Sequence, residues 1–193
     1  YLNEALVLLE EGAAARDIDK AAVAFGMPMG PITLNDLVGL DTALYAGRVV
    51  NAAYADRAAP SRILDELVGA GRLGQKSGAG FYSYAKGSRG QDDPAFAALL
   101  EQCRRERRAI SQEEITDRLF LAMLGEASRL VAEGIVRDPA DVDMGLILGI
   151  GFPAWRGGIL GWARTIGLDS IREKMAKYAP LGPRFQAAGW LAS

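Results

Sequence analysis

The chain of 193 residues is long enough for one or two domains with a sizeable core, and its 50% hydrophobic and 24% charged residues are typical of a globular protein. A formal net charge of −2 gives no general attraction to nucleic acid or to an anionic membrane surface, so we expect neither as a partner. One cysteine, Cys103, and no histidine exclude an internal disulfide and a Cys/His metal site, and a cytoplasmic location fits best.

The apolar residues of the first half follow helical spacing and predict five successive helices. Because the helical spacing of apolar residues begins at the very start of the sequence, which is Tyr1 rather than Met, we expect the chain to be part of a longer polypeptide. Asp17, Asp41 and Ser61 are predicted N-caps of the second, fourth and fifth helices, and Pro31 is predicted at the first position of the third. The apolar stripes of the third and fourth helices are made by Leu34, Leu37, Val38, Tyr45, Val49 and Ala52.

The segment GAGRLG, residues 69–74, fits the G-x-G-x-x-G pattern of dinucleotide-binding loops. That pattern binds a pyrophosphate when a buried strand precedes it and a helix follows, because the free N–H groups of the helix hold the phosphate. Here a helical pattern precedes the glycines, and a short strand, predicted at 81–84, follows them. We therefore interpret the segment as a helix exit and turn, without a cofactor.

The next segment, residues 85–94, is polar and rich in structure-breaking residues, which predicts a linker. An arginine-rich helix is expected after it. Ser111 and Glu114 then match a capping box and open a helix predicted to end near Glu133. The most apolar stretch, residues 144–154, is too short to span a membrane.

The second half repeats the motifs of the first in the same order. The aligned segments are 3–12 with 125–134, 17–19 with 141–143, 26–28 with 151–153, and 39–41 with 167–169. This repetition predicts an all-α protein with two copies of one helical domain, residues 1–84 and 95–193. We expect the copies to pack as a pseudo-dimer in which each buries the apolar face of the other.

Residues suited to acid–base catalysis are scarce, since histidine is absent. Glu4 and Glu126 are equivalent in the two copies, which favours a structural role for both. Cys103 lies among arginines that could lower its pKa, but no histidine base is present to activate it. The arginines within 104–108 could hold a phosphate, although the glutamates between them favour a solvated face. No catalytic residue is predicted.

Two turns rich in glycine and proline, residues 26–31 and 149–153, lie at the same place in the two copies. Glycine and proline there would fix a tight turn between helices. The alternative interpretation is a rim that lets an acyl chain or a neighbouring domain approach the backbone closely.

These motifs resemble those of a known family. YLNEALVLLEEG, GMPMGPITLNDLVGLDT and GRLGQKSGAGFYSY are similar to the C-terminal domain of 3-hydroxyacyl-CoA dehydrogenases. EASRLVAEGIV, DVDMGLILGIGFPAWRGG and GPRF resemble the tandem copy in the alpha subunit of the fatty acid β-oxidation multifunctional complex. The resemblance implies the helical fold of the 6-phosphogluconate dehydrogenase C-terminal-like class. It also implies a parent that oxidises (S)-3-hydroxyacyl-CoA with NAD and carries an enoyl-CoA hydratase region upstream.

In that family an upstream Rossmann domain binds NAD and carries the His/Glu pair, and an asparagine orients the substrate. The resemblance therefore implies that this chain alone is inert and that its helical domains cap the acyl-CoA cleft. The candidate substrate-binding residues are Met27, Pro28, Gly30, Pro31, Leu148 and Phe152. Leu148 stands where some relatives have a tyrosine, and it cannot hydrogen-bond a substrate.

A function of a different class stays open: a helical interaction module that docks a thiolase beta subunit or another copy of the chain. Exposure of Trp155, Trp162 and Trp190 would favour it, and burial of all three would oppose it. A dehydrogenase of the 6-phosphogluconate type would need one continuous long-helix domain, which the duplication disfavours.

Overall fold

The computed structural model describes residues 1–85, 90–105 and 108–191, which form ten α-helices and no β-strand. The helices of the first half are α1 (Leu2–Glu10), α2 (Ala15–Phe25), α3 (Pro31–Val38), α4 (Leu40–Ala53) and α5 (Ile63–Gly69). Those that follow are α6 (Pro94–Cys103), α7 (Gln112–Ala132), α8 (Pro139–Ile150), α9 (Gly158–Ile166) and α10 (Leu168–Tyr178). Short 3-10 turns are η1 (Gln75–Ser77), η2 (Ala154–Arg156), η3 (Ala179–Leu181), η4 (Pro183–Phe185) and η5 (Gly189–Leu191). The predicted all-α fold is confirmed.

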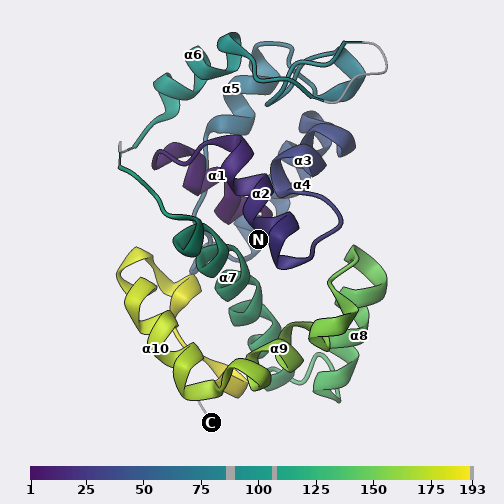
Figure 1. Ribbon diagram of the computed structural model, residues 1–193, viewed down its shortest axis with the longest axis vertical. Helices are drawn as coiled ribbons and strands as arrows, with labels where there is room; N and C mark the ends of the chain where they lie inside the picture. The colour runs from purple at the N-terminus through teal and green to yellow at the C-terminus, as the bar shows by residue number, and fades with distance from the viewer. Residues whose placement is uncertain (86–89, 106–107, 192–193) are drawn as a thin grey trace.

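The long helix α7 runs through the middle of the molecule, with α1 to α6 above it and α8 to α10 around its lower end in Figure 1. It packs against α1 and α2 of the first half and against α8, α9 and α10 of the second. The Oγ of Ser111 accepts the backbone N–H of Glu114 at 3.1 Å, which confirms the Ser111 half of the predicted capping box, while the Glu114 carboxylate pairs with Arg108 and Arg118. The helix ends at Ala132, close to the predicted end.

Each half packs its helices in the same way. α1 contacts α2 and α3, α2 contacts α3, and α3 contacts α4; α7 to α10 make the four corresponding contacts. On α2, Asp19 accepts the backbone N–H of Ile32 at the start of α3, at 2.8 Å. On α8, Asp143 accepts the backbone N–H of Leu160 in the first turn of α9, at 2.7 Å. The aligned DID and DVD segments therefore make one and the same inter-helix contact in each half.

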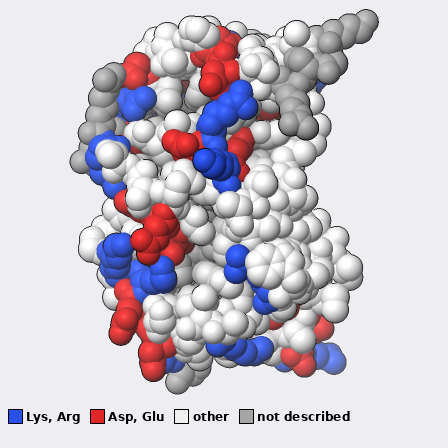
Figure 2. Space-filling model, viewed as in Figure 1, with Lys and Arg blue, Asp and Glu red and all other residues white. Residues whose placement is uncertain are grey.

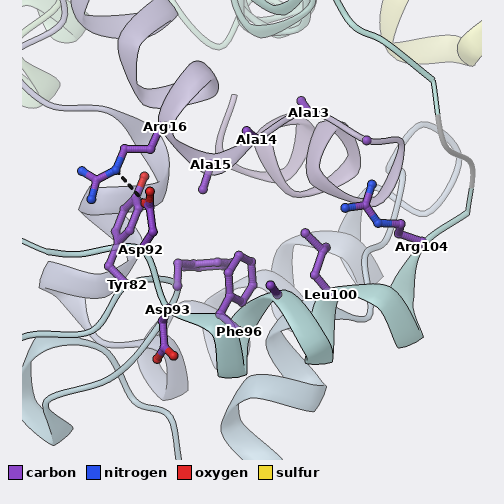
Figure 3. A pocket seen from close by; sticks show the side chains of 13 residues that line it. Ala13, Ala14, Ala15, Arg16, Tyr82, Asp92, Asp93, Phe96, Leu100 and Arg104 are labelled. Carbon is purple, nitrogen blue, oxygen red and sulfur yellow. Dashed lines mark hydrogen bonds and ion pairs between the residues drawn. The ribbon is translucent and has the colours of Figure 1, made fainter.

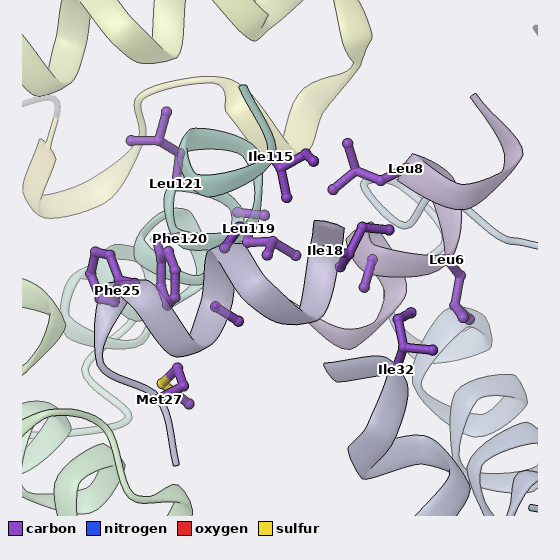
Figure 4. Packing of buried hydrophobic residues seen from close by; sticks show 14 of the residues in the cluster. Leu6, Leu8, Ile18, Phe25, Met27, Ile32, Ile115, Leu119, Phe120 and Leu121 are labelled. Atoms are coloured by element: carbon purple, nitrogen blue, oxygen red, sulfur yellow. The ribbon is translucent and has the colours of Figure 1, made fainter. Parts of the chain in front are cut away.

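The core lies where α2 meets α7. The rings of Phe25 and Phe120 stack with centroids 3.5 Å apart, and Met27 lies below them in Figure 4. Ile18 and Leu119 continue the same contact along the two helices and are fully buried. Burying each such side chain contributes about 1.5–3 kcal/mol, so this contact is a main source of stability between the halves.

The helix starts differ in detail from the sequence prediction. Pro31 opens α3 as expected, but Asp17 and Asp41 lie inside the first turns of their helices, and Ser61 precedes the cap of α5. The observed N-caps are Ala14, Gly39 and Arg62. The two aspartates still favour their helices, because a negative charge in the first turn interacts well with the helix dipole.

The strand predicted at 81–84 is wrong for the described residues, which form only isolated bridges there. The backbone N–H groups of Phe81 and Tyr82 donate to the Asp36 carboxylate, at 2.9 and 3.0 Å, instead of to a neighbouring strand. The helix α6 ends at Cys103, so the described arginines Arg104, Arg105 and Arg108 are not helical, and residues 106–107 of the predicted arginine-rich helix lie outside the described residues. Residues 86–89 of the predicted linker lie outside the described residues.

The predicted apolar stripe of α4 is not buried in the described structure. Leu40 is the buried residue of this helix, whereas Tyr45 is 75% exposed and Val49 is also exposed. Leu37 and Val38 at the end of α3 are exposed as well. No helix among the described residues is both long and apolar enough to cross a membrane.

Candidate substrate-binding surface

The two aligned glycine–proline turns contact each other. Gly26 ends α2 with a φ of +120°, and Gly151 ends α8 with a φ of +69°. A Cβ added at Gly26 would lie 2.9 Å from Pro153, and one added at Gly151 would lie 2.9 Å from Pro28. Since Gly26 aligns with Gly151 and Pro28 with Pro153, the contact occurs twice with the roles exchanged. Two units related by a two-fold axis make contacts of this kind.

The predicted substrate-binding residues gather around this junction but point in different directions. Met27 and Phe152 are buried, and the rings of Phe152 and Phe25 form a T-shaped pair with 5.8 Å between centroids. Pro28 is exposed and Leu148 is 78% exposed. Of the six predicted residues, only these last two are exposed to a molecule outside the protein.

Gly30 and Pro31 are buried where α3 begins. A Cβ at Gly30 would lie 2.1 Å from the Asp19 carboxylate, so the absence of a side chain lets this carboxylate reach the start of α3. Gly158 has the same relationship to the Asp143 carboxylate, at 2.3 Å. These glycines therefore shape the backbone of the junction.

The GAGRLG segment does not fit a nicotinamide cofactor. α5 ends at Gly69, and the short 3-10 turn η1 follows Gly74 where a phosphate-binding helix would have to start. Cβ atoms at Gly74 and Gly80 would lie 2.3 and 1.9 Å from Asp36, so these glycines let the loop pack tightly on α3. The loop closes a structural turn, as interpreted from the sequence.

Two tyrosines fasten this loop to the helices. Tyr82 donates its hydroxyl to Asp19 and Tyr84 donates its hydroxyl to Asp36, both at 2.9 Å. Burial, with a further contribution from the two carboxylates, raises the pKa of both phenols. Burial also raises the pKa of Asp36 despite its hydrogen bonds.

A buried group of charges joins the halves near α1. The guanidinium of Arg118 on α7 is fully buried and donates to Glu4 at 2.7 Å and to Glu11. Arg184, near the end of the chain, also donates to Glu4. Both carboxylate oxygens of Glu4 therefore accept hydrogen bonds from arginines, which is in keeping with a structural role rather than with proton transfer.

The equivalent Glu126 pairs with Arg57 of the first half, at 2.9 Å between Oε1 and Nε. Burial raises the pKa of the Cys103 thiol and nearby glutamates act in the same direction, which disfavours the reactive thiolate. The neighbouring arginines of the described chain pair with carboxylates rather than forming an open phosphate site: Arg104 with Glu101, Arg105 with Glu10, and Arg108 with Glu11 and Glu114.

A surface groove of about 240 Å³ lies between the start of α2 and α6 (Figure 3). Its floor is apolar and includes Phe96 and Leu100. At one end Arg16 pairs with Asp92 at 2.7 Å. The groove can hold a small apolar group but lacks an acid–base pair. Among the residues that the structure describes, no cluster of His, Cys, Asp and Glu could hold a metal ion.

The structure also shows a polar group that the sequence reasoning missed, Arg156 in η2. Its Nε donates to the backbone carbonyl of Phe25 at 2.8 Å, and its guanidinium lies 3.9 Å from the Phe25 ring centroid and 4.2 Å from that of Trp155. Alignment of the two turns could not reveal it, because the first copy has no arginine at the corresponding place. Of the three tryptophans, Trp155 is 72% exposed, Trp162 is buried and Trp190 is partly buried.

Comparison with known proteins identifies the fold. The family described as "3-hydroxyacyl-CoA dehydrogenase, C-terminal domain" matches residues 1–84 and 115–191. The chain belongs to this family. A curated relative of this dehydrogenase domain, "Fatty acid oxidation complex subunit alpha" of Psychrobacter sp. (strain PRwf-1), is 38% identical over 194 residues. The match covers 97% of the chain but 27% of the relative, so the chain spans about a quarter of that protein.

Two solved structures share the fold of this dehydrogenase domain. The 3-hydroxybutyryl-CoA dehydrogenase of Escherichia coli matches with a TM-score of 0.79 and 22% identity, over 100% of this chain and 57% of that one. The dehydrogenase part of multifunctional enzyme 1 from C. elegans matches with a TM-score of 0.72 and 23% identity, over 98% and 44%.

Proposed function

We propose that this domain is the C-terminal part of an NAD-dependent (S)-3-hydroxyacyl-CoA dehydrogenase of fatty acid β-oxidation, acting in the cytoplasm. The observation that carries the proposal is the family match in two segments, each containing the aligned motifs of one copy. The 38% identity to a fatty acid oxidation alpha subunit supports the same pathway. NAD and the catalytic base would be supplied by another part of the parent protein, because the described loops do not fit the cofactor.

In this proposal residues 1–84 and 95–193 are two copies of the domain, residues 85–94 connect them, and the copies pack as a pseudo-dimer. Its support is the reciprocal contact of the two turns and the reciprocal Glu–Arg pairs between the halves. The junction of the turns would cap the acyl-CoA cleft, with Pro28 and Leu148 toward the acyl chain. Met27, Gly30, Pro31 and Phe152 would support this surface from beneath.

The coding region upstream of Tyr1 tests the proposal. We expect it to encode a strand followed by G-x-G-x-x-G, and later a histidine and an asparagine. The longer protein should reduce NAD⁺ with 3-hydroxybutyryl-CoA, whereas the present chain should form no NADH. An upstream region without these features, or NADH formation by this chain alone, would contradict the proposal.

The capping role has its own test in the longer protein. Pro28→Asp places a charge on the exposed rim and should raise the KM for acyl-CoA, with little change in the unfolding temperature. Gly69→Asp, at the exposed end of α5, is a control that adds the same charge away from the turns and should leave the KM unchanged. Equal KM values for the two variants would argue against the cap.

A second function, docking of a thiolase beta subunit, is favoured by the exposure of Trp155. Large exposed aromatic side chains commonly anchor interfaces. Replacing Trp155 with Ala in the longer protein should release a co-purifying thiolase subunit while NADH formation is retained. If the thiolase subunit still co-purifies with the Trp155→Ala variant, this surface is not its binding site.

A further inference from the structure

Arg156 is held in a fixed orientation at the junction of the two turns. Its Nε is bonded to the Phe25 carbonyl, and its guanidinium packs against the rings of Phe25 and Trp155. These contacts leave Nη1 and Nη2 as the remaining donors. An arginine that is stacked on aromatic rings presents these donors in one plane, which suits an acceptor with two oxygens.

The guanidinium has no carboxylate partner in the part of the chain that the structure describes, and its Nη atoms have no hydrogen-bond acceptor there. Burial lowers its pKa, and no neighbouring charge opposes this. Arg57, Arg118 and Arg184 differ from it, because each pairs with a glutamate. A partly buried cation without a partner is unfavourable, so the site favours an anion from outside the described chain.

The surroundings of Arg156 are apolar. Trp155 is exposed beside it, the Trp155 ring and Pro153 lie against Gly26 at the end of α2, and Pro28 lies against Gly151. Figure 2 shows a broad area without acidic side chains on the side of the molecule where α3 and α8 lie. A molecule that reaches the guanidinium edge would also cover apolar surface, which favours an organic anion over inorganic phosphate.

We propose that Arg156 and Trp155 form a binding site for a carboxylate attached to an apolar group. The carboxylate pairs with Nη1 and Nη2, and the apolar group lies on the Trp155 indole. The site does not depend on the proposed dehydrogenase function, since it needs only η2 and the end of α2. Failure of either proposal therefore leaves the other standing.

Titration of the ¹⁵N-labelled chain with octanoate tests the site, and octanamide serves as a neutral probe of the same shape. The indole N–H signal of Trp155, assigned with Trp155→Phe, reports binding at this position. Octanoate should shift the signal saturably and bind at least about tenfold more tightly than octanamide, because a charge-assisted bidentate contact is lost in the amide. Equal affinities, or equal binding of inorganic phosphate, would overturn the proposal.

Two variants separate the site from general charge effects. Arg156→Lys keeps the charge but loses the planar pair of donors, and it should weaken octanoate binding about fivefold or more. Arg164→Lys is the matched control, since its guanidinium lies 5.0 Å from the Trp190 ring, and it should leave the affinity unchanged. Unchanged affinity in a folded Arg156→Lys variant would overturn the proposal.

If Arg156→Lys does not fold, Trp155→Ala removes only an exposed side chain and retains the guanidinium. Binding is then followed at the Nε–H signal of Arg156. Loss of at least about threefold in octanoate affinity supports the site, because the apolar contact with the indole is removed. Full affinity without the indole contradicts it.

Discussion

Arg57 and Glu126 form an ion pair between the two halves, with 2.9 Å between Nε and Oε1. Arg184 and Glu4 form the counterpart. Each arginine follows the fourth helix of its own half, α4 or α10, and each glutamate lies at the aligned position of the first helix of the other half. One interaction is therefore made twice with the halves exchanged, although the two pairs differ in burial.

This difference predicts unequal effects of removing the two charges. Glu4→Gln should lower the free energy of unfolding by about 3–5 kcal/mol, because it leaves the buried guanidinium of Arg118 short of a partner. Glu126→Gln should cost no more than about 1 kcal/mol, because the Glu126 side chain is 46% exposed. Urea unfolding measures both, and equal losses would contradict the proposed role of burial.

The junction of the turns predicts a strong preference for glycine at its centre. Gly26→Ala and Gly151→Ala should each destabilise the protein by about 2 kcal/mol, since both have positive φ and face a proline. Gly145→Ala in α8 is the control. Its Cβ would meet nothing within 4 Å, and we expect a gain of about 0.5–1 kcal/mol from helix propensity. Thermal unfolding of the three variants gives the order of their stabilities. A Gly26→Ala variant more stable than the wild type would count against the observed contact.

Acid should weaken the charge cluster at α1. Burial raises the pKa of Glu11, but its contacts with Arg118 and Arg108 outweigh burial and lower it overall. A lowered pKa means that the stabilisation is present above the unfolded value of about 4.3 and is lost as the pH falls through the folded value. Glu11→Gln should therefore be less stable than the wild type at pH 7, and the difference should shrink below about pH 4. Burial raises the pKa of Asp36, so its contribution to stability decreases, rather than increases, as the pH rises through the acid range. A difference that is independent of pH would exclude the ion pairs as its source.

Alkali should release the loop that Tyr82 and Tyr84 fasten. Because the pKa of each phenol is raised in the folded protein, the stabilisation is present below the unfolded value of about 10 and is lost as the pH rises above it. The double variant Tyr82→Phe, Tyr84→Phe should lose less stability than the wild type between about pH 9 and 11. Urea unfolding across this range measures it. Identical pH dependence of stability in the two proteins would show that these hydroxyls do not cause the alkaline loss of stability.

The sequence predicts most of the helices, because helical spacing, Pro31 and the Ser111 cap are local signals. It also places Asp19 and Asp143 at aligned positions. The Glu–Arg pairs could not be predicted, since Arg57 and Arg184 lie outside the aligned motifs and their partners are distant in the chain.

The candidate site could be located from the sequence but not oriented. The aligned turns predicted Met27 and Phe152 as substrate-binding residues, and both are buried. Apolar character alone does not distinguish a side chain that faces a ligand from one that fills the core. Tyr45 shows the opposite case, since its place in an apolar stripe indicated burial and it is exposed. The direction of these side chains depends on how the two halves meet, which no local pattern records.

The packing of the halves through their equivalent turns can be tested by one cross-link. The added Cβ of Gly151 lies 3.9 Å from the Cβ of Pro28, within the range that a disulfide requires. In a Cys103→Ser background, Pro28→Cys with Gly151→Cys should form an intramolecular disulfide under mild oxidation, detected by mass spectrometry of the digested protein. Pro28→Cys with Gly145→Cys should stay reduced. Equal cross-linking of the two pairs, or none in the first, would contradict the account.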